Sequence, residues 1–106
     1  MVEKRKRKIN KYADLSEPEA VFDFHGRGIL SEQQMCSLAR DFVLESAKNG
    51  YSRILLIVGK GLHSKGGPVI GPVLRVFLST LVGVSAVRTA RRDRGGEGAF
   101  EVRLHV

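Results

Sequence analysis

The sequence has 106 residues, a net charge of +7 at pH 7 and a hydrophobic share of 42%. This length suits one domain with a modest core and is short for two. The longest apolar run, residues 54–58, is too short to span a bilayer, and no apolar stretch of a secretory signal follows the basic N-terminus. The single cysteine, Cys36, excludes an internal disulfide, and no CxxC pair is present for zinc. We therefore expect a cytoplasmic globular domain.

The positive charge is concentrated at the N-terminus. Residues 1–11 hold six Lys or Arg and one Glu, so they carry +5 and the rest of the chain only +2. Residues 1–19 also lack hydrophobic periodicity, which predicts a flexible basic tail before one domain over residues 20–106. Such a tail either keeps the protein in solution or tethers it to phosphate backbones, and the composition leaves both interpretations open.

The first half of the domain alternates strand and helix patterns. The letters AVFDFHG at 20–26 alternate as a strand does and end in glycine. A helix follows, which Ser31 begins as N-cap, with Gln34 completing a capping box, and which Gly50 ends. The letters RILLIV at 53–58, apolar after Arg53, predict a second strand.

The second half predicts a helix and two further strands. A glycine-rich loop, GKGLHSKGGPVIG at 59–71, precedes Pro72, which suits a first helical turn. Strands are predicted at 84–90 and 99–106. The order β-α-β-α-β-β predicts a two-layer α/β sandwich with three parallel strands, an antiparallel fourth and both helices on one face. Because the second strand is apolar throughout, the segment YADLSEP (12–18) or a partner protein should cover its other face.

Glycines and basic or titratable residues follow the three parallel strands. Their carboxyl ends share one edge of the sheet, here called the rim, which is the usual ligand position in open α/β sheets. Helix N-termini beside the rim favour anions. The sequence therefore predicts a phosphate-binding rim. Its residues are His25, Gly26 and Arg27 after the first strand, Gly59, Lys60, Gly61, His63, Ser64 and Lys65 after the second, and Arg91, Arg92 and Arg94 after the third.

The glycine loop does not match either familiar nucleotide-binding motif. Gly61 follows Lys60 where a Walker A motif has Ser or Thr, and Ser64 stands where the GxGxxG motif needs its last glycine. Nucleotide binding of either kind is therefore not expected. The prediction of an anion site remains, because it depends on the geometry of the rim and its charge.

The three histidines differ in their surroundings. A single histidine at a strand end is more often structural than catalytic, and we interpret His105 in that way. Asp23 lies two residues before His25 on the same side of the strand, where its carboxylate can accept from the imidazole and select its tautomer. His63 lies in the glycine loop. Because two histidines and Lys60 share one basic rim, a catalytic role for these histidines is about as well supported as a structural one.

Two motifs in this order resemble those of the small MutS-related (Smr) domain family. They are FDFHGRG at 22–28 and GKGLHS at 59–64, followed by the small-residue turn GGEG at 95–98. Family members have Leu-Asp-x-His-Gly at the end of one strand and Gly-Lys-Gly with His-Ser after the next. The resemblance covers residues 21–106, and Phe22 replaces the usual leucine of the first motif.

The resemblance implies a fold like the C-terminal domain of translation initiation factor 3, with sheet order 1-2-4-3. It also implies nicking or endonucleolytic cleavage of DNA or of RNA, including ribosome-bound messenger. The family is not uniform in activity, so the resemblance also allows a protein that binds nucleic acid without cleaving it. The functional residues that the resemblance carries over are Asp23, His25, Gly26, Gly59, Lys60, Gly61 and His63.

We therefore predict an endonuclease that cleaves RNA or branched DNA. Asp23, His25, His63 and Lys60 take the catalytic roles, with the loop amides and the rim arginines holding the phosphate. RNA cleavage by its own 2′-hydroxyl needs no metal, so a divalent ion, Mg²⁺ or Mn²⁺, is expected only if DNA is the substrate.

Two alternatives remain open. The first is a non-catalytic module that binds nucleic acid or the ribosome through the same basic residues. The second is a protein-interaction module that uses the uncovered face of the second strand. A monomer is the expectation, or a dimer if that face self-associates.

Overall fold

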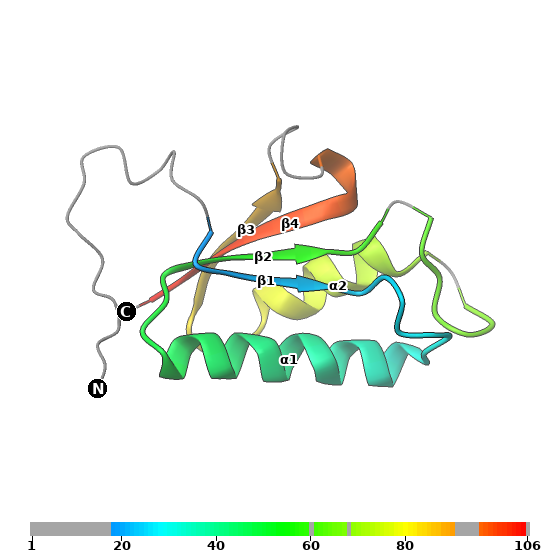
Figure 1. Ribbon diagram of the computed structural model, residues 1–106, viewed down its shortest axis with the longest axis horizontal. Helices are drawn as coiled ribbons and strands as arrows, with labels where there is room; N and C mark the ends of the chain where they lie inside the picture. The colour runs from blue at the N-terminus through cyan, green and yellow to red at the C-terminus, as the bar shows by residue number, and fades with distance from the viewer. Residues whose placement is uncertain (1–17, 60, 68, 91–95, 106) are drawn as a thin grey trace.

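The computed structural model describes residues 18–59, 61–67, 69–90 and 96–105. Within these residues the chain forms one four-stranded sheet and two helices (Figure 1). None of the helices in these ranges is long and apolar enough to cross a membrane. The elements in chain order are β1 (Ala20–Asp23), α1 (Glu32–Lys48), β2 (Arg53–Ile57), α2 (Ile70–Ser79), β3 (Val84–Thr89), the 3-10 turn η3 (Gly96–Gly98) and β4 (Ala99–Leu104).

The sheet has the predicted order β1-β2-β4-β3. Strands β1 and β2 are parallel, whereas β4 runs antiparallel to both of its neighbours, β2 and β3. It follows that β1, β2 and β3 point in one direction, and both helices lie on the same side of the sheet (Figure 1). The prediction of a two-layer α/β sandwich is therefore confirmed, and the rim exists as one end of this sheet.

Helix α1 begins and ends where its capping residues predict. The hydroxyl of Ser31 accepts from the backbone N–H of Gln34 at 3.0 Å, and the Gln34 side chain accepts from the Ser31 N–H at 2.8 Å. Gly50 follows the helix with a φ of +77°, a left-handed conformation that glycine adopts without strain. An N-cap of this kind stabilises a helix by about 1 kcal/mol. The amino end of α1 is therefore held firmly beside the rim.

The helices cover the face of β2 formed by Ile54, Leu56 and Val58. These three side chains are at most 1% exposed and belong to the main core cluster. Phe24, which follows β1, points into the same cluster and is 2% exposed. The alternation along β1 therefore directs Phe22 and Phe24 to the core side of the sheet and Asp23 to the other side.

The opposite face of β2 carries a smaller apolar cluster. Leu55 is 4% exposed and packs with Ile57, Ala90 and Ala99. The sequence predicted that something other than the helices must cover this face. Residues 12–17, most of the segment suggested as cover, lie outside the described part of the chain. The small cluster therefore explains some of the apolar side chains that β2 carries on the face away from the helices.

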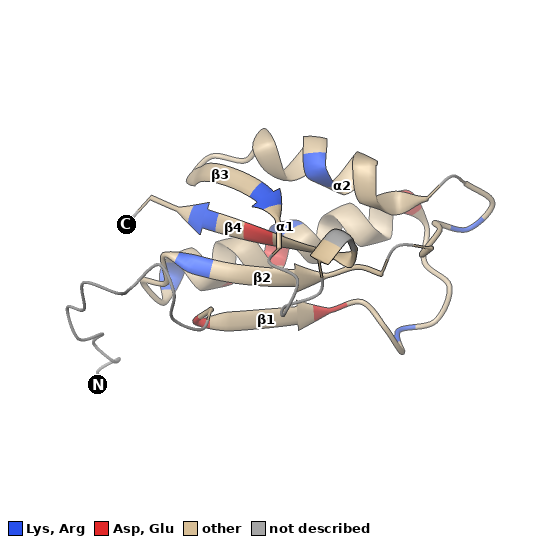
Figure 2. Cartoon of the chain, turned by 90° about the horizontal axis from the view of Figure 1, so that it is seen from above, with Lys and Arg blue, Asp and Glu red and all other residues tan. Residues whose placement is uncertain are grey.

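Charged side chains occupy the rest of this open face. In the strand register Arg53 lies opposite Arg103, and Glu101 lies opposite Arg88. Figure 2 shows these basic positions on β2, β3 and β4 with an acidic one on β4. Neighbours of opposite charge, such as Glu101 and Arg88, stabilise a sheet by a few tenths of a kcal/mol up to about 1 kcal/mol, whereas directly opposed like charges do not. The open face is thus amphipathic, with alanines near the rim and charges farther along the strands.

Candidate functional site

The end of β1 carries an aspartate–histidine pair. The imidazole Nδ1 of His25 lies 2.8 Å from Oδ1 of Asp23, and the backbone N–H of His25 donates to the same oxygen at 2.9 Å. The side chains are 63% and 50% exposed, respectively. Because an ionised carboxylate only accepts, Nδ1 carries the proton and Nε2 remains a proton acceptor. The pair therefore offers an oriented basic nitrogen to a ligand in solvent.

The protonation state of Asp23 follows from the same contacts. The backbone N–H of His25 holds the pKa of the Asp23 carboxyl below its ordinary value, and the imidazole hydrogen bond and the positive charge of Arg27 act in the same direction. Partial burial opposes the shift without reversing it. Hydrogen bonds to the charged form favour that form, so the carboxylate is ionised at neutral pH.

Gly59 brings the two sequence motifs into contact. A Cβ atom added to Gly59 would lie 3.0 Å from Nε2 and 3.4 Å from Cε1 of His25, so the imidazole rests against this glycine. The φ of Gly59 is +87°. Glycine is thus required here both for the backbone conformation and for the close approach of the ring.

The amide of Gly59 is not a phosphate donor. Its N–H donates to the carbonyl of Gly98 at 2.8 Å, and the N–H of Val58 donates to the same oxygen at 2.7 Å. The expectation that the loop amides hold the phosphate is wrong at this position, because the turn before β4 already occupies this donor. The two bonds instead hold Gly59 rigidly against the sheet.

Arg27 is positioned over an aromatic ring. Its Nε donates to the carbonyl of Asp23 at 2.9 Å, and its Cζ lies 4.3 Å from the ring centroid of Phe22. Phe22 packs edge-on against Phe24 with centroids 4.9 Å apart. Such a cation–π contact restricts the guanidinium while leaving its other donors in solvent. Phe22 thus packs against the core on one side and supports Arg27 on the other, which the sequence did not indicate.

The second imidazole lies in the loop before α2. Nδ1 of His63 contacts the carbonyl oxygen of Gly67 at 3.1 Å, and because a carbonyl only accepts, this nitrogen carries the proton. The N–H of Lys65 donates to the carbonyl of Leu30 at 2.8 Å and joins this loop to the segment before α1. His63 is exposed, as is Lys65. Two loops that carry a histidine each are therefore linked at the rim.

The other predicted rim residues differ in exposure, and some lie outside the described part of the chain. Ser64 was predicted to contact the ligand, but it is only 5% exposed. A Cβ on Gly67 would overlap its hydroxyl, so Ser64 packs inside the loop. Gly26 and Gly61 are exposed. The remaining predicted positions lie outside the described residues; they are Lys60, Arg91, Arg92 and Arg94.

Metal ligands do not gather at the rim within the described ranges. No group of three or more His, Cys, Asp or Glu residues there is arranged to hold an ion.

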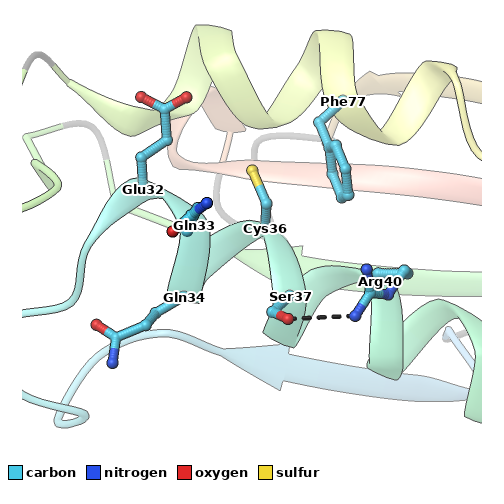
Figure 3. A pocket seen from close by; sticks show the side chains of 7 residues that line it. All are labelled: Glu32, Gln33, Gln34, Cys36, Ser37, Arg40 and Phe77. Carbon is cyan, nitrogen blue, oxygen red and sulfur yellow. Dashed lines mark hydrogen bonds between the residues drawn. The ribbon is translucent and has the colours of Figure 1, made fainter.

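A pocket of about 540 Å³ lies away from the rim, between the first turns of α1 and Phe77 of α2. Figure 3 shows the thiol of Cys36 and the carboxylate of Glu32 in its lining. Burial, and then the negative charge of Glu32, raise the pKa of this thiol.

Comparisons with known proteins agree with the resemblance noted in the sequence. A family model described as the Smr domain matches residues 22–105. An uncharacterised protein of Treponema pallidum (strain Nichols) is 30% identical over 91 residues, which cover 82% of this chain and 42% of that protein. The chain thus spans less than half the length of this relative.

Two crystal structures have similar folds. The Smr domain of Thermus thermophilus MutS2 is 22% identical with a TM-score of 0.63, over 82% of this chain and 99% of that one. YdaL, a stand-alone small MutS-related protein from Escherichia coli, is 24% identical with a TM-score of 0.65, over 89% and 71%. At these identities the similarity concerns the fold alone.

Proposed function

The chain belongs to the Smr domain family, and from this premise we propose that it is an endonuclease that cleaves nucleic-acid phosphodiesters at the rim. One observation carries the proposal: the 2.8 Å contact between Asp23 and the Nδ1 of an exposed His25, whose opposite ring nitrogen faces Gly59 of the second motif. A carboxylate that selects the tautomer of a solvent-facing imidazole suits a general base. RNA is the favoured substrate, because its 2′-hydroxyl supplies the nucleophile.

The proposed reaction uses the two imidazoles as base and acid. Nε2 of His25 takes the proton of the 2′-hydroxyl, whose oxygen attacks the phosphorus. The bond from phosphorus to the 5′-oxygen breaks, and Nε2 of a protonated His63 gives that oxygen a proton. The products are a 2′,3′-cyclic phosphate and a 5′-hydroxyl. Asp23 stabilises the imidazolium that forms on His25. Acid–base catalysis of this kind contributes about 10²- to 10⁴-fold in rate.

Positive groups at the rim stabilise the charge that develops on the phosphate. Arg27 is held by Asp23 and Phe22 with its guanidinium in solvent, and Lys65 is exposed on the neighbouring loop. Lys60, which the resemblance to the family carries over as a functional residue, is expected to act as a third cation. Cations that are already positioned stabilise a transition state without a reorganisation cost.

The test is cleavage of end-labelled single-stranded RNA, duplex DNA and junction DNA, each with EDTA and with Mn²⁺. His25→Ala and His63→Ala should each lower RNA cleavage on the order of 10²-fold or more while leaving RNA binding nearly unchanged. His105→Ala is the matched control, because this exposed histidine follows β4 at the opposite end of the sheet. Binding without turnover on any substrate would replace the enzyme with a nucleic-acid-binding module. Equal cleavage by all three variants would contradict the roles of His25 as base and His63 as acid.

A further inference from the structure

A pocket of about 380 Å³ opens beside Gly59, between the carboxyl ends of β2 and β3 and the amino end of α2. Its apolar walls include Val58, Val69 and Phe100, and its polar groups are the side chains of Arg75 and Thr89. Sites for small ligands have this composition, mostly apolar with a few placed polar groups, and begin at about 300 Å³. None of these five residues was among the predicted rim residues.

Gly59 joins this pocket to the Asp23–His25 pair. It lines the pocket, and it also supports the imidazole, since a Cβ added to it would lie 3.0 Å from Nε2 of His25. Hydrogen bonds from Gly59 and Val58 to the carbonyl of Gly98 hold this junction in place. Gly59 is therefore the residue at which the pocket and the imidazole of His25 meet.

We propose that the pocket binds the nucleoside that flanks the scissile phosphate, its base between the apolar walls and its polar edge at Arg75 and Thr89. The proposal rests on the proposed function, since it assigns the substrate of the same rim. A nucleobase combines apolar faces with a polar edge, which matches walls of Val58, Val69 and Phe100 with two polar groups at one side. Guanidinium groups also stack on bases, so Arg75 suits any of the four.

The position of Arg75 supports this role. Arg75 lies four residues after Gly71, so both project from the same face of α2, and both line the pocket. One guanidinium nitrogen, Nη2, donates to the carbonyl of Val87 at 3.4 Å and so ties the side chain to β3. The remaining donors of the guanidinium are available to a ligand.

The pocket can be filled by one substitution that leaves the fold intact. A Cβ added to Gly71 meets no atom within 4 Å, and the φ of Gly71 is not positive. Gly71 precedes Pro72, and this offsets the advantage of about 1 kcal/mol that leucine otherwise has over glycine in a helix. Gly71→Leu should therefore fold and place its side chain in the pocket. Val76→Leu is the matched control on the same helix, because Val76 is 66% exposed and lies outside the pocket lining.

The probe is uridine 3′-monophosphate, titrated into ¹⁵N-labelled full-length protein and followed by amide chemical shifts. In the wild type the shifts should include Gly59 and Thr89. Gly71→Leu should weaken binding at least 10-fold, whereas Val76→Leu should not. Equal binding by the two leucine variants, or shifts that omit the pocket residues, would overturn the proposal.

Cleavage of RNA separates this proposal from the proposed function. If the wild type cleaves RNA, Gly71→Leu should raise KM at least several-fold, and an unchanged KM would refute the nucleoside site. If the wild type does not cleave but Gly71→Leu still abolishes nucleotide binding, the pocket stands and the assignment as an endonuclease fails.

Discussion

Replacing Gly59 by alanine tests whether the two motifs act through direct contact. The added Cβ would lie 3.0 Å from Nε2 of His25, whereas ordinary contacts of this kind begin at 3.4 Å, so the imidazole must move by several tenths of an ångström. A misplacement of about 1 Å can cost roughly 10²-fold in rate, so we expect RNA cleavage to fall roughly 10-fold. The φ of +87° also costs alanine about 1–2 kcal/mol in folding free energy.

Gly50→Ala is the control for the backbone cost. Gly50 has a similar φ of +77°, but nothing lies within 4 Å of an added Cβ. The two variants should therefore lose about 1–2 kcal/mol of unfolding free energy each, measured by urea denaturation, and both should remain folded. Only Gly59→Ala should show the roughly 10-fold slower cleavage in single-turnover assays on labelled RNA, and the NMR resonances of its His25 ring should shift. If both variants cleaved RNA equally fast, the contact between glycine and imidazole would not matter for the reaction.

The remaining predictions concern three charged or titratable groups. The lowered pKa of Asp23 means that its carboxylate stabilises the fold above about pH 4 and that this stabilisation is lost as the pH falls through the lower folded-state value. Asp23→Asn should therefore reduce the loss of urea stability between pH 5 and pH 3, and an unaltered acid dependence would contradict the assigned contacts. Arg27→Gln should weaken RNA binding and lower the slope of log K against log salt by about 0.7, as expected for one lost phosphate contact, and an unchanged slope would remove Arg27 from the interface. Because burial and the charge of Glu32 raise the pKa of Cys36, Glu32→Gln should speed the reaction of this thiol with an aromatic disulfide reagent at pH 8, and an equal rate would refute the electrostatic effect.

The local elements and one functional contact could be predicted from spacing alone. The capping box of Ser31 and Gln34 determined the start of α1, and alternation determined which side of β1 enters the core. The pairing of Asp23 with His25 was also predictable, because residues two apart at a strand end lie on one side. The family resemblance supplied the sheet order, and the structure confirmed it.

Contacts between distant segments were decided only by the tertiary structure. Spacing could not indicate that Gly98 would occupy the amide of Gly59, because β4 is inserted between β2 and β3 late in the chain. The burial of Ser64 depends in the same way on how the loop folds back onto Gly67. In each case the predicted donor or hydroxyl was present in the sequence, but another part of the chain competed for it.

The sequence by itself determined the strands, the helices and the oriented imidazole, since periodicity and capping act between residues a few positions apart. Tertiary structure alone decided that this imidazole rests on Gly59 and that a pocket lies beyond it. The walls of the pocket come from four elements or their ends, with Val58, Arg75, Thr89 and Phe100 among them. No local pattern relates such residues, because only the packing of α2 against the sheet brings them together.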